Sequence, residues 1–336
     1  MQRLIVTAPR HAEFEPIEMP DCPADGLLVR ARVTAVSTGT EIRVFRLVPV
    51  DDEGKFMHAT VPCEVPTENG YAMVGEVIAV GSEVSGFEVG DRVSAHATHR
   101  HVAAVPASTA VRVPDGVSDE QAVFLNIIEV GHIALRRGEP TPGETVAVIG
   151  LGIVGLSTLA FCKAFGFRTI AIDGVAERLD IARRMGADLV ISPDEPDIEA
   201  RVGAVTGGRG ADLVIEAASV WPAIELGMRV AARKATVVVV ARHTDMPAFS
   251  PVGHPYLQKD LTLRVTYGHA PAGQRWDRTS SLGLTLEMLA KGQLDISELL
   301  THRIGWSELP SMYERLDQGE RDIVGVIVDW GDEDED

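Results

Sequence analysis

Apolar positions in the middle of the chain fall into short continuous runs, and stretches of helical periodicity separate these runs. Thr145–Ile149 and Arg168–Ile172 are rich in β-branched residues, which is typical of strands buried on both faces of a parallel sheet. Positions 156–165 between them repeat apolar residues at helical spacing. Further strands are predicted at Leu189–Ile191, 213–217, 237–241 and 261–266, and further helices at 176–186 and 281–289. This alternation predicts an α/β fold with a doubly wound parallel sheet.

The first third of the chain shows strands and turn signals but few helical repeats. Half-alternating runs at 27–36 and Met73–Val80, with turn signals such as Gly90-Asp91, predict a small β-barrel. A helical pattern begins at Ser118, a capping residue followed by two acids, and predicts one or two helices over 118–137. We interpret 324–328 as a last strand that returns to the barrel.

Three glycines directly after the first buried strand carry the clearest chemical signal. Gly150, Gly152 and Gly155 have G-x-G-x-x-G spacing, with a strand before them, a helix after them and Asp173 at the end of the next strand. The first glycine allows a tight turn, the second lets a pyrophosphate approach the backbone, and the third lets the helix pack close to the sheet. The free N–H groups and the dipole of the helix N-terminus favour phosphate. The motif therefore predicts a dinucleotide site that also includes Leu151, Ile153 and Val154.

Asp173 indicates which dinucleotide binds. A carboxylate at the end of the second strand accepts hydrogen bonds from both adenosine ribose hydroxyls and repels a 2′-phosphate. NAD is therefore the predicted cofactor. Ala217 and Tyr267 stand at the ends of later predicted strands, where an open α/β sheet binds its ligands, and they complete the candidate set.

Composition restricts the classes of function. The chain has 336 residues, enough for about two domains, and a formal net charge of −18. This charge disfavours nucleic acid and anionic membranes as partners. The three cysteines form no C-x-x-C pair, so neither a zinc ribbon nor a disulfide framework is expected. The N-terminal sequence MQRLIVTAPR lacks the apolar core of a signal peptide, and no apolar run approaches the length of a membrane span. We expect a cytoplasmic protein.

The order of short motifs along almost the whole chain resembles the medium-chain dehydrogenase/reductase family, which includes zinc alcohol, sorbitol and threonine dehydrogenases. The motifs are Val80-Gly81, Gly90-Asp91-Arg92-Val93, Val113-Pro114-Asp115-Gly116, Pro142-Gly143-Glu144-Thr145-Val146 and the glycine turn. The resemblance implies a GroES-like β-barrel catalytic domain, 1–117 and 268–336, split around an inserted Rossmann domain, 118–267. It also implies that Arg178 contacts the ribose, which leaves NADP possible. A homodimer or homotetramer paired through the Rossmann edge strand, 236–241 or 261–266, is a further implication.

The residues at the family's catalytic zinc positions differ here. Thr38 stands in place of a cysteine, Tyr71 and Ala72 in place of a histidine and a glutamate, and Asn126 in place of a cysteine or glutamate. The family's four-cysteine structural lobe is also missing. Because Zn²⁺ requires Cys, His or carboxylate ligands, the resemblance implies a branch that lacks zinc, and we predict no metal site. The segments 37–41 and 70–71 are similar to those of bacteriochlorophyllide dehydrogenases in the same family.

Three residues are candidates for handling the substrate oxygen. Thr40 matches the family hydroxyl that passes the proton of the substrate alcohol; alternatively, it is a strand-end residue that satisfies a turn. Tyr71 can donate a hydrogen bond to a substrate carbonyl in place of the metal, or it is an aromatic residue of a core or cleft wall. Asn126 can donate from its amide to the same oxygen, or it bonds to the backbone of its helix.

A histidine cluster, His96, His99 and His101, and the nearby Glu41 are the alternatives for a metal site. His99 and His101 are expected to share one face of a strand. Such a run is more often an exposed strand or loop edge than a set of metal ligands.

The predicted function is an oxidoreductase that transfers a hydride between the nicotinamide and a secondary alcohol or ketone, without catalytic zinc. Two alternatives stay open: a zinc-free quinone or enoyl reductase that acts on a C=C bond, and a dinucleotide-binding protein that has lost catalysis. The expected partner is a small-molecule substrate.

Overall fold

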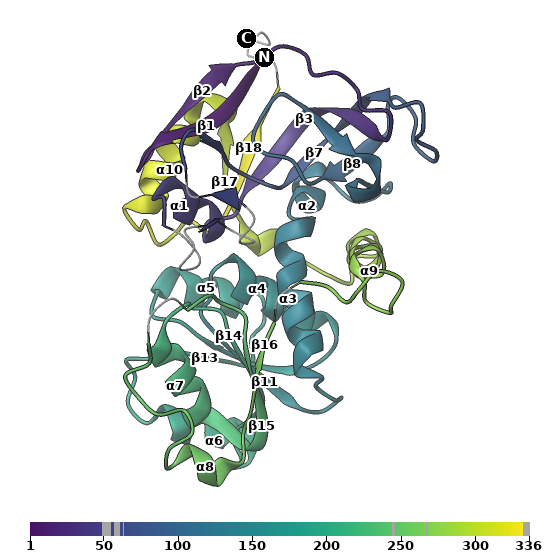
Figure 1. Cartoon of the computed structure of the whole chain (residues 1–336). Helices are drawn as coiled ribbons and strands as arrows, with labels where there is room; N and C mark the ends of the chain where they lie inside the picture. Colours follow the sequence, from purple (N-terminus) through teal and green to yellow (C-terminus); the bar gives the residue numbers. More distant parts are fainter. Residues whose placement is uncertain (49–54, 57–60, 63, 244–245, 267, 332–336) are drawn as a thin grey trace. The chain divides into compact units, whose positions relative to one another are not determined.

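The computed structural model describes residues 1–336 except 49–54, 57–60, 63, 244–245, 267 and 332–336 (Figure 1). Its contacts divide the chain into two compact units. The first is Met1–Ile127, Leu286–Lys291 and Leu300–Asp336, and the second is Ile128–Thr285 and Gly292–Leu299. The domain boundaries taken from the sequence, at 117/118 and 267/268, stay a prediction.

The first unit is built around a mostly antiparallel seven-stranded sheet. Its order is β10-β8-β7-β3-β18-β17, and β9 also pairs with β3. A second sheet has the order β2-β1-β6, and β4 pairs with β5. The strands are β1 (Gln2–Ala8), β2 (His11–Pro16), β3 (Gly26–Val36), β4 (Lys55–Phe56), β5 (Val61–Pro62), β6 (Thr67–Glu68), β7 (Met73–Val80), β8 (Arg92–Ala95), β9 (Val102–Pro106), β10 (Val111–Arg112), β17 (Leu300–Gly305) and β18 (Gly325–Asp329). The helices are α1 (Thr40–Phe45), α2 (Asp119–Val123) and α10 (Leu309–Asp317), with the short 3-10 turns Ala107–Thr109 and Trp306–Glu308.

The C-terminal strand returns to the N-terminal sheet, as predicted. β18 pairs antiparallel with β3, so the yellow strand lies beside the purple one in Figure 1. Their apolar side chains share one core with α1 and α10, in which Phe45 and Tyr313 are fully buried. Burial of this apolar surface joins segments about 300 positions apart in the sequence.

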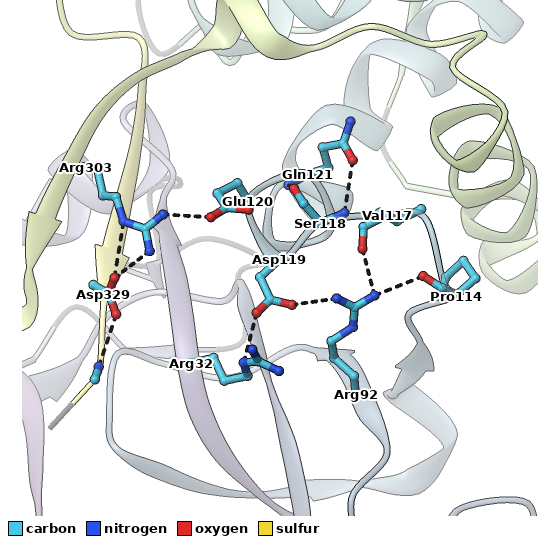
Figure 2. Close-up of polar contacts among 11 residues, drawn as sticks. Arg32, Arg92, Pro114, Val117, Ser118, Asp119, Glu120, Gln121, Arg303 and Asp329 are labelled. Atoms are coloured by element: carbon cyan, nitrogen blue, oxygen red, sulfur yellow. Dashed lines mark hydrogen bonds and ion pairs between the residues drawn. The ribbon is translucent and has the colours of Figure 1, made fainter.

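An arginine–carboxylate network fixes the start of α2 on the sheet (Figure 2). Arg92 donates to Asp119 at 3.2 Å and to the carbonyl of Val117 at 2.7 Å. Arg303, on β17, bridges Glu120 at 2.7 Å and Asp329 at 2.6 Å. Ser118 and Gln121 form a reciprocal capping box at the helix start, which confirms the start predicted from the sequence. The network joins side chains of β8, β17 and β18 to the first turn of α2.

The second unit contains a six-stranded parallel sheet of order β13-β12-β11-β14-β15-β16. Its strands are β11 (Thr145–Ile149), β12 (Arg168–Ile172), β13 (Leu189–Ile191), β14 (Ala211–Glu216), β15 (Ala231–Val239) and β16 (Thr262–Val265). Its helices are α4 (Ile153–Ala164), α5 (Ala176–Arg184), α6 (Ile198–Thr206), α7 (Trp221–Val230) and α8 (Tyr256–Lys259), with the 3-10 turn Ser297–Leu299. Two more helices, α3 (Leu125–Gly138) and α9 (Arg278–Ala290), contain residues of both units.

The strand order reverses between β11 and β14, which is the arrangement of a doubly wound sheet. Ile149 of β11 and Val214 of β14 share a core with Ile224 of α7 and Tyr256 of α8, while α4 packs on β11 and β12. The predicted α/β class and parallel sheet are confirmed.

Two details of the sequence interpretation are wrong. The strand expected at 237–241 begins earlier, at Ala231, because the chain passes directly from α7 into β15. β15 also lies between β14 and β16, so 236–241 cannot be an edge of this sheet, whereas β16 is one.

Over the residues described here, no helix combines the length and apolar character that crossing a membrane requires.

Candidate active site

The glycine turn after β11 has the geometry that its spacing predicts. Gly150 has φ +89°, a left-handed conformation that favours glycine, and a Cβ there would lie 2.6 Å from the Ala218 nitrogen. A Cβ on Gly155 would collide with the carbonyl oxygen of Gly150, so this glycine lets α4 begin against the turn. A Cβ on Gly152 would meet nothing within 4 Å. Gly152 therefore leaves open space at the helix N-terminus, where a pyrophosphate would fit.

Asp173 follows β12 and is nearly buried. Its Oδ2 accepts a hydrogen bond from the Leu151 nitrogen at 2.6 Å, and its Oδ1 accepts one from the Val175 nitrogen at 2.8 Å. Each oxygen retains a lone pair, so this carboxylate can also accept hydroxyl donors. Asp173 thus links the turn at Leu151 to the position expected for the adenosine ribose.

The other candidate cofactor residues have different surroundings. Arg178 lies on α5 with a buried Nε that has no hydrogen-bond partner among the described residues. Ala217 follows β14, and its nitrogen donates to the Ile149 carbonyl at 2.8 Å. Ile153 is buried in the first turn of α4, which also contains Val154. Tyr267 lies outside the described residues.

The first unit brings Thr40 and Tyr71 together. Thr40 is the first residue of α1, not a strand end, and Tyr71 lies two residues before β7. The Tyr71 hydroxyl donates to Oγ of Ser37 at 2.7 Å, and the Thr40 side chain is a further hydrogen-bond partner of the phenol. Burial raises the pKa of Tyr71 to about 12, so the phenol stays protonated and can act as a donor at neutral pH. The Tyr71 ring also stacks on His96, with centroids 5.7 Å apart.

Asn126 is the second residue of α3 and is half-buried. It has an interaction partner of its own. It belongs to the same compact unit as Thr40 and Tyr71. Its role as a third donor stays a prediction.

Glu41, directly after Thr40, anchors this segment in the core. The side chain is fully buried, and its Oε1 accepts from the Ser37 nitrogen at 2.7 Å. Its Oε2 contacts Nε2 of His99 at 2.9 Å and accepts from the Tyr313 hydroxyl at 2.6 Å. The 37–41 segment is therefore held by side chains from two distant parts of the chain.

The histidine cluster is not arranged as expected. His99 and His101 lie between β8 and β9, so the expectation that they share one face of a strand is wrong. His99 is fully buried, and its Nδ1 lies 2.7 Å from Oγ1 of Thr34. His101 packs against Trp306 and Trp330 and accepts from the Gln2 nitrogen. The His99 nitrogen donates to the carbonyl of Asn69, and the His101 nitrogen donates to the carbonyl of Gln2 on β1.

Sequence reasoning missed a carboxylate–imidazole pair at the ends of β14 and β15. Glu216, the last residue of β14, is fully buried, and its Oε1 accepts from the Ala218 and Ser219 nitrogens, both at 2.8 Å. Its Oε2 lies 2.9 Å from Nε2 of His243. A charged residue that ends an apolar strand, as Asp173 does, is the signal that could have identified Glu216.

A second buried pair, also missed, lies in α3. Glu129 contacts Nδ1 of His132 at 3.2 Å and accepts from Oγ1 of Thr285 at 3.0 Å. Burial alone would raise the pKa of Glu129, but the hydrogen bonds of His132 and His269 outweigh it and hold this pKa below its usual value. The two imidazoles therefore favour the ionised form of this interior carboxylate.

Comparisons with known proteins place the chain in a family. The family model described as "Alcohol dehydrogenase GroES-like domain" matches residues 24–118, and the one described as "Zinc-binding dehydrogenase" matches residues 154–281. D-guloside 3-dehydrogenase from Shigella flexneri is 28% identical over 332 residues, 93% of this chain and 95% of that protein. L-threonine 3-dehydrogenase from Idiomarina loihiensis is 28% identical over 346 residues, 94% of this chain and 95% of that protein.

A solved structure has the same fold. A protein described as a short chain alcohol dehydrogenase from Escherichia coli CFT073, in complex with NADH, superposes with a TM-score of 0.82 at 20% identity and covers 98% of this chain and 99% of its own. The chain belongs to the medium-chain dehydrogenase/reductase family, as the motif order predicts, and is an NAD(P)-dependent oxidoreductase of that family.

The family implies two bound groups, a dinucleotide and a zinc ion, and the residues of this chain fit only the first. The glycine turn, with its open space at Gly152 and the carboxylate of Asp173, fits a dinucleotide. The residues at the zinc positions do not fit Zn²⁺, because Thr38, Tyr71 and Asn126 offer neutral hydroxyls and an amide. Among the described residues, no three His, Cys, Asp or Glu side chains are grouped to hold a metal ion.

Proposed function

We propose that the protein is an NAD(H)-dependent oxidoreductase that interconverts a secondary alcohol and its ketone without catalytic zinc. The observation that carries this proposal is the hydrogen-bonded group formed by Tyr71, Thr40 and Ser37 at a position where the family has a metal ligand. The phenol of Tyr71 is protonated and is anchored beside a second hydroxyl. Two such groups can hold a substrate oxygen and exchange its proton.

The relatives support a secondary carbinol as the substrate class. The guloside and threonine enzymes are both named 3-dehydrogenases, so in both names the oxidised carbon lies within the molecule. We infer a small polyhydroxylated or amino-substituted alcohol. The family comparison supports this class and does not name one substrate.

The proposed site residues would have different roles in the reaction. Bound nicotinamide supplies the hydride acceptor or donor. Thr40 passes the alcohol proton, while Tyr71 turns its single hydroxyl hydrogen from Ser37 to the substrate oxygen and stabilises the charge that develops there. Asn126 is proposed as an additional donor. Glu41 holds the 37–41 segment in place, which fixes the distance between the two hydroxyls.

We propose NAD as the preferred cofactor because Asp173 faces the adenosine ribose position with a charged carboxylate. A 2′-phosphate there would be an unpaired like charge. Arg178 is the one proposed cofactor residue that would favour NADP, and its buried, unpartnered Nε is compatible with a polar ligand. The glycine turn, Ala217 and Tyr267 complete the proposed cofactor site.

We also propose a homodimer or homotetramer paired through β16. This strand pairs with β15 on one side, and Leu263 and Val265 on it are 49% and 70% exposed. An exposed apolar edge strand is a template for pairing with a second copy. Light scattering at micromolar concentration tests this, and a monomer mass would refute it.

The direct test of the function is to mix the purified protein with NADH and a panel of ketones, quinones and enones, and to follow NADH absorbance. Oxidation of NADH with ketones supports the proposal. Turnover only with quinones or enones would favour reduction of a C=C bond or quinone instead. Tight binding of NADH without turnover on any substrate would favour a dinucleotide-binding protein that has lost catalysis.

A further inference from the structure

The pair formed by Glu216 and His243 lies next to the dinucleotide turn. Glu216 holds the nitrogens of Ala218 and Ser219, and a Cβ on Gly150 would collide with Ala218. Within β14 and β15, Glu216 is opposite Val239, and its carbonyl accepts from the Val240 nitrogen at 3.0 Å. His243 follows three residues later. The pair therefore stands at the carboxyl ends of two adjacent parallel strands, where sheets of this class bind their ligands.

The contacts of Glu216 determine the tautomer of His243. Oε1 of Glu216 accepts from two backbone N–H groups, and an ionised carboxylate can only accept at Oε2 as well. Nε2 of His243, 2.9 Å from Oε2, must therefore carry the hydrogen. In the neutral ring Nδ1 then holds a lone pair and is an acceptor.

That acceptor has no protein partner. The His243 side chain is 8% exposed, and its Nδ1 is buried with no hydrogen-bond partner in the part of the chain that the structure describes. The ring also contacts Trp221, with centroids 5.0 Å apart. An unsatisfied buried acceptor is unfavourable, so a donor from a bound molecule would relieve it.

The place of His243 in the sheet indicates which half of the cofactor it would contact. Asp173 follows β12, on one side of the point where the strand order reverses, and would bind the adenosine ribose. His243 follows β15, on the other side, where the second mononucleotide of a dinucleotide lies. The hydrogen-bond donors of that half are the ribose hydroxyls and the amide NH₂ of the nicotinamide.

We propose that Nδ1 of His243 accepts a hydrogen bond from the nicotinamide half of the cofactor, with Glu216 fixing the tautomer. This inference rests on the proposed dinucleotide function. It adds a residue that neither the glycine motif nor the comparisons assign. Glu216 is a positioning residue, because it acts through His243 and through the backbone of Ala218.

The decisive variant is His243→Gln. A glutamine amide can still donate to Glu216 from the position of Nε2, but it has no acceptor at the position of Nδ1. We expect NADH binding, measured by fluorescence titration, to weaken about three- to tenfold, the value of one hydrogen bond. Binding of ADP, which has no nicotinamide half, should stay unchanged. The matched control is His11→Gln, because His11 is 61% exposed on β2 and should leave both affinities unchanged.

Further binding measurements identify the donor and show which results would refute the proposal. The reduced 3-acetylpyridine analogue carries a methyl in place of the amide NH₂. If the wild type and His243→Gln bind this analogue equally well, the carboxamide is the donor. If the variant still binds it more weakly, a ribose hydroxyl is the donor. Unchanged NADH affinity in the variant, or equal weakening of NADH and ADP, would overturn the proposal. A wild-type protein that binds neither NADH nor ADP would instead refute the proposed function. If the variant is unstable, the affinities of the wild type for NADH and for the acetylpyridine analogue still test whether the carboxamide is the donor. Analogues with a 2′- or 3′-deoxyribose on the nicotinamide test in the same way whether a ribose hydroxyl is the donor.

Discussion

Nε2 of His99 lies 2.9 Å from Oε2 of Glu41, and both side chains are at most 1% exposed. The other imidazole nitrogen meets Oγ1 of Thr34 at 2.7 Å, and Thr34 in turn accepts from the Trp330 indole at 2.8 Å. Every polar atom of the imidazole and the carboxylate has a partner. The network fixes the turn that carries Thr40.

Removing His99 should therefore be costly. In His99→Ala, the Glu41 carboxylate loses a buried partner, and we expect the free energy of unfolding to fall by about 3–5 kcal/mol. Urea denaturation measures this change. His11→Ala, an exposed position, should stay within about 0.5 kcal/mol of wild type. A loss below about 1 kcal/mol for His99→Ala would contradict the role of this network.

The fold could be predicted because its signals are local. The apolar runs of β11 and β12 and the cap at Ser118 each depend on a few consecutive residues, and the structure confirms them. The Glu41 network could not be predicted in this way. It joins positions 34, 41, 99, 313 and 330, and no spacing rule links residues that meet only after the two ends of the chain pair. The same reason explains why His99 appeared as a candidate metal ligand.

Tyr71→Phe should separate catalysis from cofactor binding. The variant keeps the ring that stacks on His96 but removes the hydroxyl that bonds to Ser37. A preorganised donor is worth roughly 3–4 kcal/mol in the transition state, so kcat should fall by about 10²–10³. The Kd for NADH should remain within about twofold, since this effect is confined to the oxygen of the substrate. Ser37→Ala, which removes the partner and keeps the phenol, should lower kcat less. Unchanged turnover in Tyr71→Phe would show that the phenol is only a packing residue.

The glycines of the turn should respond differently to alanine. Gly155→Ala places a methyl against the carbonyl of Gly150, and we expect a loss of about 1–3 kcal/mol in stability as well as weaker NADH binding. Gly152→Ala has open space, so stability should change little while the methyl obstructs the pyrophosphate and weakens NADH binding about tenfold or more. Thermal denaturation and fluorescence titration on both variants measure the two effects. Normal NADH affinity in Gly152→Ala would place the phosphates elsewhere.

Asp173 should determine the choice between cofactors. We expect the wild type to bind NADH more tightly than NADPH, by about 1–3 kcal/mol or roughly 5- to 150-fold, because the carboxylate repels the 2′-phosphate. Asp173→Asn removes that charge and should reduce the ratio of the NADPH dissociation constant to the NADH dissociation constant. It also leaves one of the Leu151 and Val175 nitrogens facing an amide NH₂ instead of an acceptor, so stability should fall by about 1–2 kcal/mol. Both dissociation constants are measured by titration. Equal affinities in the wild type would show that the assignment of Asp173 is wrong.

Activity without zinc is the prediction that separates this chain most sharply from the zinc enzymes of its family. Zn²⁺ needs Cys, His or carboxylate ligands, and the motif order assigns Thr38, Tyr71, Ala72 and Asn126 to the family's ligand positions. His99, the buried histidine of the candidate cluster, already has a partner on each ring nitrogen, and Glu41 is one of them. Stabilisation of the substrate oxygen must then come from hydrogen-bond donors such as Tyr71 and Thr40.

The measurement is turnover before and after dialysis against a strong chelator, with bound metal quantified by mass spectrometry. We expect less than stoichiometric zinc and unchanged kcat, because the proposed donors are part of the chain. A zinc-dependent alcohol dehydrogenase treated in parallel should lose activity and confirms that the chelator works. Stoichiometric zinc in the purified protein, together with chelator-sensitive turnover that added Zn²⁺ restores, would contradict the proposal. The Tyr71→Phe variant then decides what the phenol does, since a metal-dependent enzyme should retain most of its turnover without it.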